Sequence, residues 1–441
     1  MYFSLGIMYL CIDPISSTPD EQEHMLRAYG ISRGDFIAEI NSSGEGGGFA
    51  PENMVYGLKR GATSLKDMYD NIGMEASDNE VFMIYSNTAL YSPITYFPQS
   101  LGIFLARLFC NKPYIWAYTG RVFNMITIGL LAFWTIKIIP IGKYIVFIFL
   151  MLPMNMYECA SLSGGGLAFT GTLLLTAYVL WLRYEKKGKI NKCETAIIYI
   201  LLLIVASCKI VYAPFVLLVI MIPRELFGSK KIYIFHIVCA SVMIFTASAG
   251  WVSIASRYLI EYNEGVDSIA QCKFMLRNPL NYIQVVFNTF MYSGEWVVRT
   301  FFAGSLGYFD VNVNIFVILM SAFNIVYVVL HENLALSDVL LKKYSFKIPS
   351  ILIFCSVIIT IFGILSSEYV QWTPYGYNHI EGLQGRYFFP VVVPALLAVK
   401  KKQITNNKTS VRCYCGNDAY NLIIVGFVNL LTIITLFVHY I

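Results

Sequence analysis

Residues 232–254 read IYIFHIVCASVMIFTASAGWVSI and contain no Asp, Glu, Lys or Arg. An α-helix needs about 20 apolar residues to cross the hydrocarbon core of a bilayer, and this run meets that length. It follows the segment RELFGSKK (residues 224–231), which carries one Arg and two Lys. Since a helix satisfies its own backbone hydrogen bonds in lipid, we predict a transmembrane helix that starts beside a basic loop.

The same pattern recurs along the chain. Of its 441 residues, 57% are hydrophobic and 13% are charged, a composition that excludes a soluble protein. Helical spans are predicted near residues 117–139, 144–160, 167–184, 195–208, 210–223, 232–254, 313–330, 348–370, 387–399 and 419–440. Two further apolar segments with polar interruptions, 93–110 and 283–302, are expected to be re-entrant or to lie along the interface. The fold class is therefore an all-α polytopic membrane protein with about 11–13 transmembrane or re-entrant helices.

Acidic and basic residues are segregated along the sequence. The segment 13–91 holds 13 of the 27 Asp and Glu residues, whereas basic residues gather in later gaps, at residues 183–192, 224–231, 342–347 and 400–412. By the positive-inside rule, these gaps are cytoplasmic and the acidic segment is external. We therefore expect one integral membrane domain, residues 1–441, with a large external first loop (13–91) that contains amphipathic helices. A second large external segment should cover residues 255–312.

This alternation places five segments on the outside, and they should converge on one face. They are residues 13–91, 161–166, the tip at Lys209, residues 255–312 and residues 371–386. Lys209 lies between two short apolar runs, which are expected to form a hairpin with its tip at the outer leaflet.

The run STPDEQEHMLR (residues 17–27) suggests the start of a helix in the first external loop. Thr18 and Glu21 have the spacing of a capping box, and Asp20 and His24 share one face of the expected helix. Asp20 could deprotonate a sugar hydroxyl or hold a divalent metal, and His24 could orient it. The alternative interpretation is a capped helix that is simply solvated.

The run EGLQGRYFFP (residues 381–390) places Arg386 at the external mouth of a helix, after Gly385, which would let the backbone approach a ligand closely. A guanidinium group forms bidentate hydrogen bonds to phosphate oxygens, although Arg386 could also extend to lipid headgroups. Three further cations beside hydrocarbon could join it or could pair with acids, namely Lys209, Arg121 and Arg257.

Three other patterns carry weaker signals. Glu295 and Arg299 are four residues apart and are expected to pair on one helix. The glycine-rich run at Gly44–Gly48 lacks the ending of a phosphate-binding loop and is interpreted as a flexible loop. Cys413 and Cys415 lack the partner ligands that a structural zinc site needs.

Several short motifs also occur in a characteristic order. They are PDE-x-x-H (19–24), Y-S-P-x-x-Y-x-P (91–98), G-R (120–121), K-x-x-Y-x-P (209–214), L-G-Y-F-D (306–310) and Q-G-R-Y-F-x-P (384–390). Across nearly the whole chain, this set resembles the bacterial predicted membrane protein family of unknown function 2142. That family is similar to the GT-C glycosyltransferases.

The resemblance implies a GT-C-like bundle with its active site on the external face of the cytoplasmic (inner) membrane. The implied donor is a polyprenyl-phosphate-linked sugar, and the implied acceptor is a cell-envelope glycan or a lipid-linked glycan. Asp20, with Glu21 beside it, matches the first-loop acid that acts as base or metal ligand. We expect these two residues to be catalytic, and the expected binding residues are Arg386, Lys209, Arg121, Arg257, His24, Gln384 and Tyr387.

The second acid that relatives often carry after a Ser-rich turn is missing here. The turn is SLSGGG (residues 161–166), and the nearest carboxylate is Glu158. We therefore assign no ligands to a divalent metal, and the missing acid favours a metal-independent mechanism over a metal-dependent one. Besides the lipid bilayer, the partners implied are the donor and the acceptor, and no nucleic acid is expected.

A transporter or flippase for a lipid-linked glycan is the alternative function. A transporter of the inverted-repeat kind would show two related halves and acids near the bilayer midplane. The sequence shows no repeat, and its acids gather in the first external loop. These features favour the enzyme.

Overall fold

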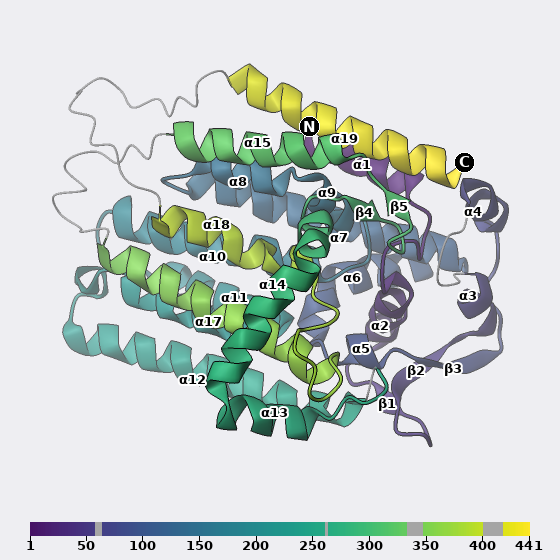
Figure 1. Cartoon of the computed structure of the whole chain (residues 1–441), viewed down its shortest axis with the longest axis horizontal. Coiled ribbons are helices and arrows are strands. Elements are labelled where there is room, and N and C mark those ends of the chain that lie inside the picture. Colours follow the sequence, from purple (N-terminus) through teal and green to yellow (C-terminus); the bar gives the residue numbers. More distant parts are fainter. Residues whose placement is uncertain (58–63, 261–262, 333–346, 400–417) are drawn as a thin grey trace.

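The computed structural model describes residues 1–57, 64–260, 263–332, 347–399 and 418–441. Its long helices lie side by side in a bundle (Figure 1). Within the described residues, five helices are long and apolar enough to cross a membrane: Pro113–Ile138, Gly165–Tyr184, Lys230–Tyr258, Pro349–Gln371 and Ala419–Tyr440. The expected all-α polytopic membrane fold is thus confirmed.

The bundle elements follow the apolar runs of the sequence. They are α1 (Tyr2–Ile12), α7 (Pro113–Ile138), α8 (Lys143–Leu150), α9 (Pro153–Cys159), α10 (Gly165–Tyr184), α11 (Lys192–Cys208), η2 (Ile210–Met221), α12 (Lys230–Ala255), α14 (Pro279–Phe301), α15 (Ile315–His331), α17 (Lys347–Gln371), α18 (Phe389–Val399) and α19 (Asp418–Tyr440). Most of these elements begin and end within a few residues of the predicted spans.

The first loop and the connections form shorter elements. In the first loop and the segment after it, these are α2 (Glu21–Arg33), β1 (Glu39–Ile40), β2 (Gly46–Pro51), α3 (Glu52–Gly57), α4 (Leu65–Asn71), β3 (Glu80–Ile84), α5 (Ser86–Ala89), η1 (Pro93–Tyr96) and α6 (Phe97–Arg107). The connections form η3 (Arg224–Phe227), η4 (Ser256–Tyr258), α13 (Ser268–Arg277), β4 (Ser305–Leu306), β5 (Val311–Asn312) and η5 (Gly385–Phe388).

The span expected at 144–160 is broken into two helices, α8 and α9. Pro153 stands at the first turn of α9, where its missing N–H costs nothing, but a continuous helix would lose a hydrogen bond there. The amide of Asn155 donates to the carbonyl of Leu150 at 2.8 Å and so satisfies one backbone group at the break. In contrast, residues 283–301 lie in one uninterrupted helix, α14, in which Glu295 and Arg299 pair at 4.0 Å as expected.

The hairpin predicted around Lys209 is present, but its second arm is not an α-helix. η2 is a 12-residue 3₁₀ helix with Pro214 inside it, and it packs against α11 and α17. The hydroxyl of Ser356 on α17 donates to the carbonyl of Pro214 at 3.1 Å. This contact helps to hold the arm against the bundle.

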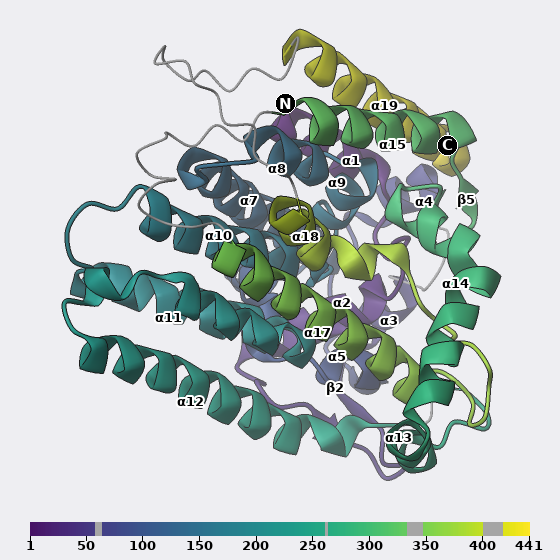
Figure 2. The same ribbon diagram turned by 60° about the vertical axis from the view of Figure 1, so that its left-hand side comes forward.

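The segregated charges lie at opposite ends of the bundle. The acidic first-loop elements pack together at the right of Figure 1, whereas the α10–α11 and η2–α12 connections lie at the other end (Figure 2). A hydrogen bond of 2.9 Å from the backbone N–H of Ile190 to the carbonyl of Leu226 joins these two basic connections. The other basic residues, 342–346 and 400–412, lie outside the described residues, as do Cys413 and Cys415.

The glycine-rich run is not a flexible loop, and that prediction is wrong. Gly46–Gly48 open strand β2, which pairs with both β1 and β3 in a small antiparallel sheet. A Cβ atom at Gly47 would lie 2.0 Å from the carbonyl oxygen of Met83. Close packing within the sheet, not flexibility, explains the glycine there.

Helix α2 is fixed to the bundle by a buried cluster around Arg121 of α7. The guanidinium of Arg121 donates to both carboxylate oxygens of Glu21, at 2.8 and 2.5 Å, and to the carbonyl of Asp13 at 2.6 Å. The same two oxygens of Glu21 accept the backbone N–H groups of Leu162 at 3.0 Å and Ser16 at 2.9 Å. One carboxylate therefore ties together the end of α1, the start of α2, α7 and the turn after α9.

The predicted capping box is wrong for the same reason. α2 begins at Glu21, and the Thr18 hydroxyl donates to Asp13 at 3.1 Å instead of capping the helix. Both oxygens of Glu21 accept from Arg121, because leaving a buried guanidinium without a charged partner costs more free energy than losing this helix cap.

Glu21→Gln is expected to lower the free energy of unfolding by about 3 kcal/mol, because it leaves a buried guanidinium without its main partner. Thermal unfolding of the purified protein in detergent measures this loss. The matched control is Glu225→Gln in the exposed Arg224–Glu225 pair, which should lower the free energy of unfolding by about 1 kcal/mol or less. Equal stability of the two variants would contradict a central role for Glu21.

Single cysteines at exposed positions test the arrangement of the two ends. Ser42 and Asn378 lie at the acidic end and Lys187 at the basic end, and all three are exposed. Cysteines at Ser42 and Asn378 should react with an impermeant thiol reagent added to intact cells, above the labelling of the parent, and one at Lys187 should not. If only the cysteine at position 187 is labelled, the basic end faces outside and the predicted topology is wrong.

Candidate functional site

A cavity of about 300 Å³ opens at the end of the bundle where the first loop packs. Four long helices have one end here, since α10 begins beside the cavity and α11, α12 and α17 end beside it. All five segments predicted to be external contribute to its lining, through Asp20, Gly164, Lys209, Leu259 and Trp372. The expected convergence of these segments on one face is therefore observed.

The cavity is lined by both charged and aromatic side chains. The charged groups come from Asp20, Glu158, Lys209, Glu368 and Arg386, and five aromatic residues join them, Tyr91, Tyr212, Trp251, Trp372 and Tyr387. Such a mixture of converging charges and apolar walls is typical of a site for a ligand that is partly polar and partly apolar.

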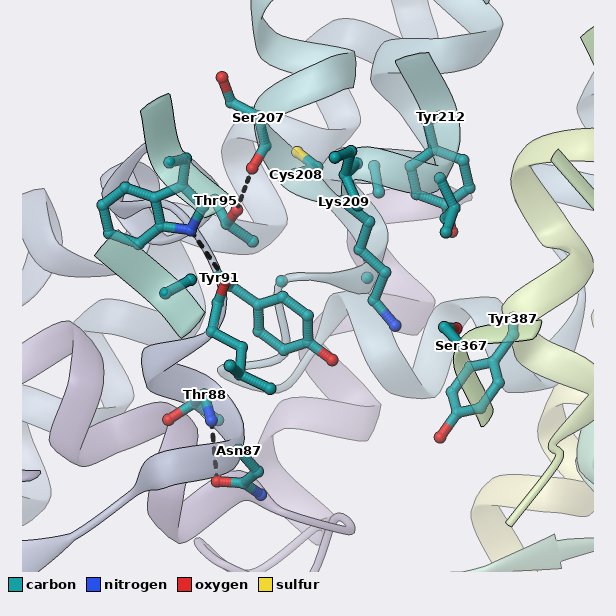
Figure 3. A pocket seen from close by; sticks show the side chains of 18 of the residues that line it. Asn87, Thr88, Tyr91, Thr95, Ser207, Cys208, Lys209, Tyr212, Ser367 and Tyr387 are labelled. Carbon is teal, nitrogen blue, oxygen red and sulfur yellow. Dashed lines mark hydrogen bonds between the residues drawn. The ribbon is translucent and has the colours of Figure 1, made fainter. Parts of the chain in front are cut away.

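Lys209 extends into the cavity from the tip of the α11–η2 hairpin. Its amine lies 4.8 Å from the ring centroid of Tyr387 and 5.1 Å from that of Tyr91 (Figure 3). A hydrogen bond of 3.4 Å from the Thr95 hydroxyl to the carbonyl of Ser207 holds the tip against η1. Within the described ranges, Lys209 forms cation–π contacts and no ion pair, so its charge is available to an anion.

Arg386 reaches the cavity from η5, where its Nη1 donates to Glu158 at 2.8 Å. Both side chains are buried, and Nε of Arg386 has no hydrogen-bond partner among the described residues. The close backbone approach predicted at Gly385 is made to α14 and not to a ligand: a Cβ there would lie 2.0 Å from the carbonyl oxygen of Val297. The backbone N–H of Gly385 donates to the Thr300 hydroxyl at 2.7 Å, which fixes the start of η5.

Asp20 is held at the cavity in an unusual backbone conformation. Its φ of 61° and ψ of 11° lie in the left-handed region, which costs about 1 kcal/mol or more for most residues and is tolerated best by Asn and Asp. The pinned Glu21 beside it leaves the chain little freedom to relax. Strain of this kind often occurs where a side chain is held for a function.

His24 lies one turn further along α2 and also lines the cavity. Its Nδ1 is 2.7 Å from the hydroxyl of Tyr96. Burial, together with the positive charges of Arg386 and Lys209, lowers the pKa of His24 to about 3. The ring is therefore neutral near pH 7 and acts as a hydrogen-bonding group, not as a cation.

Five of the nine predicted site residues line this cavity: Asp20, His24, Lys209, Arg386 and Tyr387. The other four do not. Glu21 and Arg121 form the buried cluster beneath α2, and Arg257 is exposed on η4. Gln384 is half-buried and is not among the residues that line the cavity.

Sequence reasoning missed two acidic residues of the site. Glu158 was noted only as the nearest carboxylate to the SLSGGG turn, and its partner Arg386 is 228 residues away in the chain. Glu368 was not singled out, although it is the one charged residue in the apolar run 348–370. An acid at the end of an apolar helix is a signal for a functional residue and could have identified it.

No metal site emerges within the part of the chain that the structure describes. There, no group of three or more His, Cys, Asp or Glu side chains is placed to hold an ion. Glu158, the acid nearest to the expected second-loop position, is bonded to Arg386.

Fold and cavity together define a polytopic membrane protein that carries a charged, aromatic-lined pocket at one end of its helix bundle. The sequence pattern of the predicted membrane protein family DUF2142 matches residues 3–395, and the chain belongs to this family. No curated protein and no solved structure gives a significant match.

The low pKa of His24 predicts a pH dependence of stability. The folded-state value of about 3 lies below the ordinary 6.5, so the unfolded chain takes up the proton first as the pH falls. Stability should therefore drop below about pH 6.5, by about 1 kcal/mol between pH 7 and pH 5 once solvent in the cavity is considered.

Thermal unfolding at pH 7 and pH 5 measures this effect. The drop should be smaller in His24→Gln than in the parent, whereas His379→Gln, outside the cavity, should behave as the parent does. An identical drop in His24→Gln would show that His24 does not cause it.

Proposed function

We propose that this protein is a membrane glycosyltransferase. It would move a sugar from a polyprenyl-phosphate donor to a cell-envelope glycan or a lipid-linked acceptor, on the external face of the cytoplasmic membrane. The observation that carries the proposal is a pocket in which Lys209 and Arg386 offer positive charge close to carboxylates and beside an apolar helix.

The two cations suit the phosphate of such a donor. Lys209 has aromatic neighbours and no ion pair among the described residues, and Arg386 keeps its Nε donor unused while Glu158 holds its Nη1. A phosphate oxygen would satisfy the buried Nε donor, which is costly to leave unbonded.

The wall of the pocket formed by α12 suits the lipid portion. Trp251, Val252 and Ala255 of this helix line the cavity. In the most apolar 18-residue window of α12, only 11% of the residues are buried, so most of its surface faces outward. An isoprenoid chain could thus lie along α12 while its phosphate reaches Lys209.

Asp20 is the candidate base. If the transfer inverts the anomeric centre, the acceptor oxygen attacks the anomeric carbon while the bond from that carbon to the phosphate oxygen breaks, and polyprenyl phosphate leaves. The acceptor hydroxyl loses its proton in this step, and a carboxylate within hydrogen-bond reach usually accepts it. Asp20 lines the pocket, whereas Glu21, its predicted companion, is fully engaged in the Arg121 cluster. The catalytic assignment therefore narrows to Asp20.

Asp20→Asn is expected to bind donor but to lose about 10²- to 10⁴-fold in transfer rate, the usual effect of removing a general base. Asn tolerates the left-handed conformation as Asp does, so the backbone should not change. The assay uses purified protein in liposomes with radiolabelled polyprenyl-phosphate sugars and envelope glycan acceptors.

The control is Asp78→Asn, an exposed first-loop acid outside the cavity, which should retain the parent rate. Near-parent transfer by Asp20→Asn would remove Asp20 from catalysis. Movement of the lipid-linked sugar across the bilayer without transfer would instead indicate a flippase.

A further inference from the structure

Glu368 is a buried carboxylate that the roles above do not use. It lies in the last turn of α17, lines the cavity and is 8% exposed. Its Oε2 atom has no hydrogen-bond partner among the described residues. A buried acceptor of this kind is costly unless a partner satisfies it, and the open cavity is where a partner can come from.

The backbone around Glu368 is fixed, which leaves its side chain a well-defined position. Its carbonyl accepts the N–H of Trp372 at 3.0 Å and the Thr373 hydroxyl at 3.3 Å, and that hydroxyl in turn accepts the N–H of Glu381 at 3.0 Å. These bonds fold the loop that leads to Arg386 back over the end of α17. The peptide groups are satisfied by this turn, and the carboxylate is left for another role.

The charges around Glu368 select the chemistry of its partner. Lys209, Arg386 and Glu368 all line the same cavity, so a ligand there meets two cations and one carboxylate. A phosphate beside the two cations would be repelled by Glu368, whereas a neutral hydrogen-bond donor next to that phosphate would be attracted. In a sugar-1-phosphate ester, the ring hydroxyls are such donors and lie adjacent to the phosphate.

We propose that Glu368 binds a hydroxyl group of the donor sugar and so contributes to recognition of the sugar that is transferred. This inference rests on the proposed function and deepens it. Lys209 and Arg386 would hold the phosphate, Glu368 would hold the sugar attached to it, and Asp20 would remain for the acceptor hydroxyl. The substrate class is accordingly a polyprenyl-phosphate sugar with a free ring hydroxyl.

Binding measurements separate the contribution of the sugar from that of the phosphate. The probes are polyprenyl phosphate alone and polyprenyl phosphate carrying glucose, mannose or galactose, titrated into the purified full chain and followed by tryptophan fluorescence. Trp251 and Trp372 line the cavity and report on it. The variants are Glu368→Gln, Arg386→Lys and the control Glu381→Gln, which removes an acid outside the cavity.

Glu368→Gln should weaken binding of the preferred sugar-bearing lipid about 10- to 100-fold, as expected for a hydrogen bond to a charged group. It should change binding of polyprenyl phosphate less than about threefold, which is under 1 kcal/mol. Arg386→Lys should weaken both kinds of lipid, because Lys lacks the planar fork. Glu381→Gln should change neither.

Other outcomes distinguish the two proposals. If Glu368→Gln weakens both lipids equally or neither, Glu368 does not read the sugar, and the inference is wrong while the anionic-lipid site stands. The same holds if the parent binds polyprenyl phosphate but gains nothing from any hexose. If the parent binds none of the probes, the proposed function itself fails. Thermal unfolding of each variant checks that the loss is not one of folding.

Discussion

The buried pairing of Arg121 with Glu21 is the interaction on which the site depends. Placing these charges away from water carries a large desolvation cost, which is offset because each of the three guanidinium nitrogens of Arg121 has an acceptor. The cluster joins α7 to the start of α2; Asp20 directly precedes this helix and His24 lies in its first turn. The position of those two side chains in the cavity is therefore a consequence of a charge cluster that does not line it.

The structure uses two buried Arg–Glu pairs in different ways. The guanidinium of Arg121 is fully occupied, since it donates to Glu21, Asp13 and backbone carbonyls. Arg386 lines the cavity; Glu158 accepts a hydrogen bond from its Nη1, and its Nε has no hydrogen-bond partner among the described residues. Both arginines directly follow a glycine, so the local sequence does not distinguish them. The acceptors around each guanidinium make the difference: those of Arg121 occupy it fully, whereas Arg386 keeps a donor that suits a ligand.

Much of the fold could be predicted from the sequence, because lipid imposes a strong rule on helix length and loop charge. The spans, the separation of acidic and basic ends and the tip at Lys209 follow from that rule. The break at Pro153 and the role of Glu21 could not be predicted, since each depends on which groups meet in the folded chain. Arg121 and Glu21 are 100 residues apart, and Arg386 and Glu158 are 228 apart. Local spacing contains no information about such pairs, so the site was identified only in part.

The 3₁₀ geometry of η2 also sets the length of this hairpin arm and so the position of Lys209. At about 2.0 Å per residue, its 12 residues extend about 24 Å. The 17 residues of α11 form an α-helix of similar length, about 26 Å. The same 12 residues wound as an α-helix would extend only about 18 Å. The two arms of the hairpin match in length because the second is stretched. A substitution at Pro214 that let this arm rewind would draw the tip inward by about 6 Å and take the Lys209 amine away from the rings of Tyr91 and Tyr387.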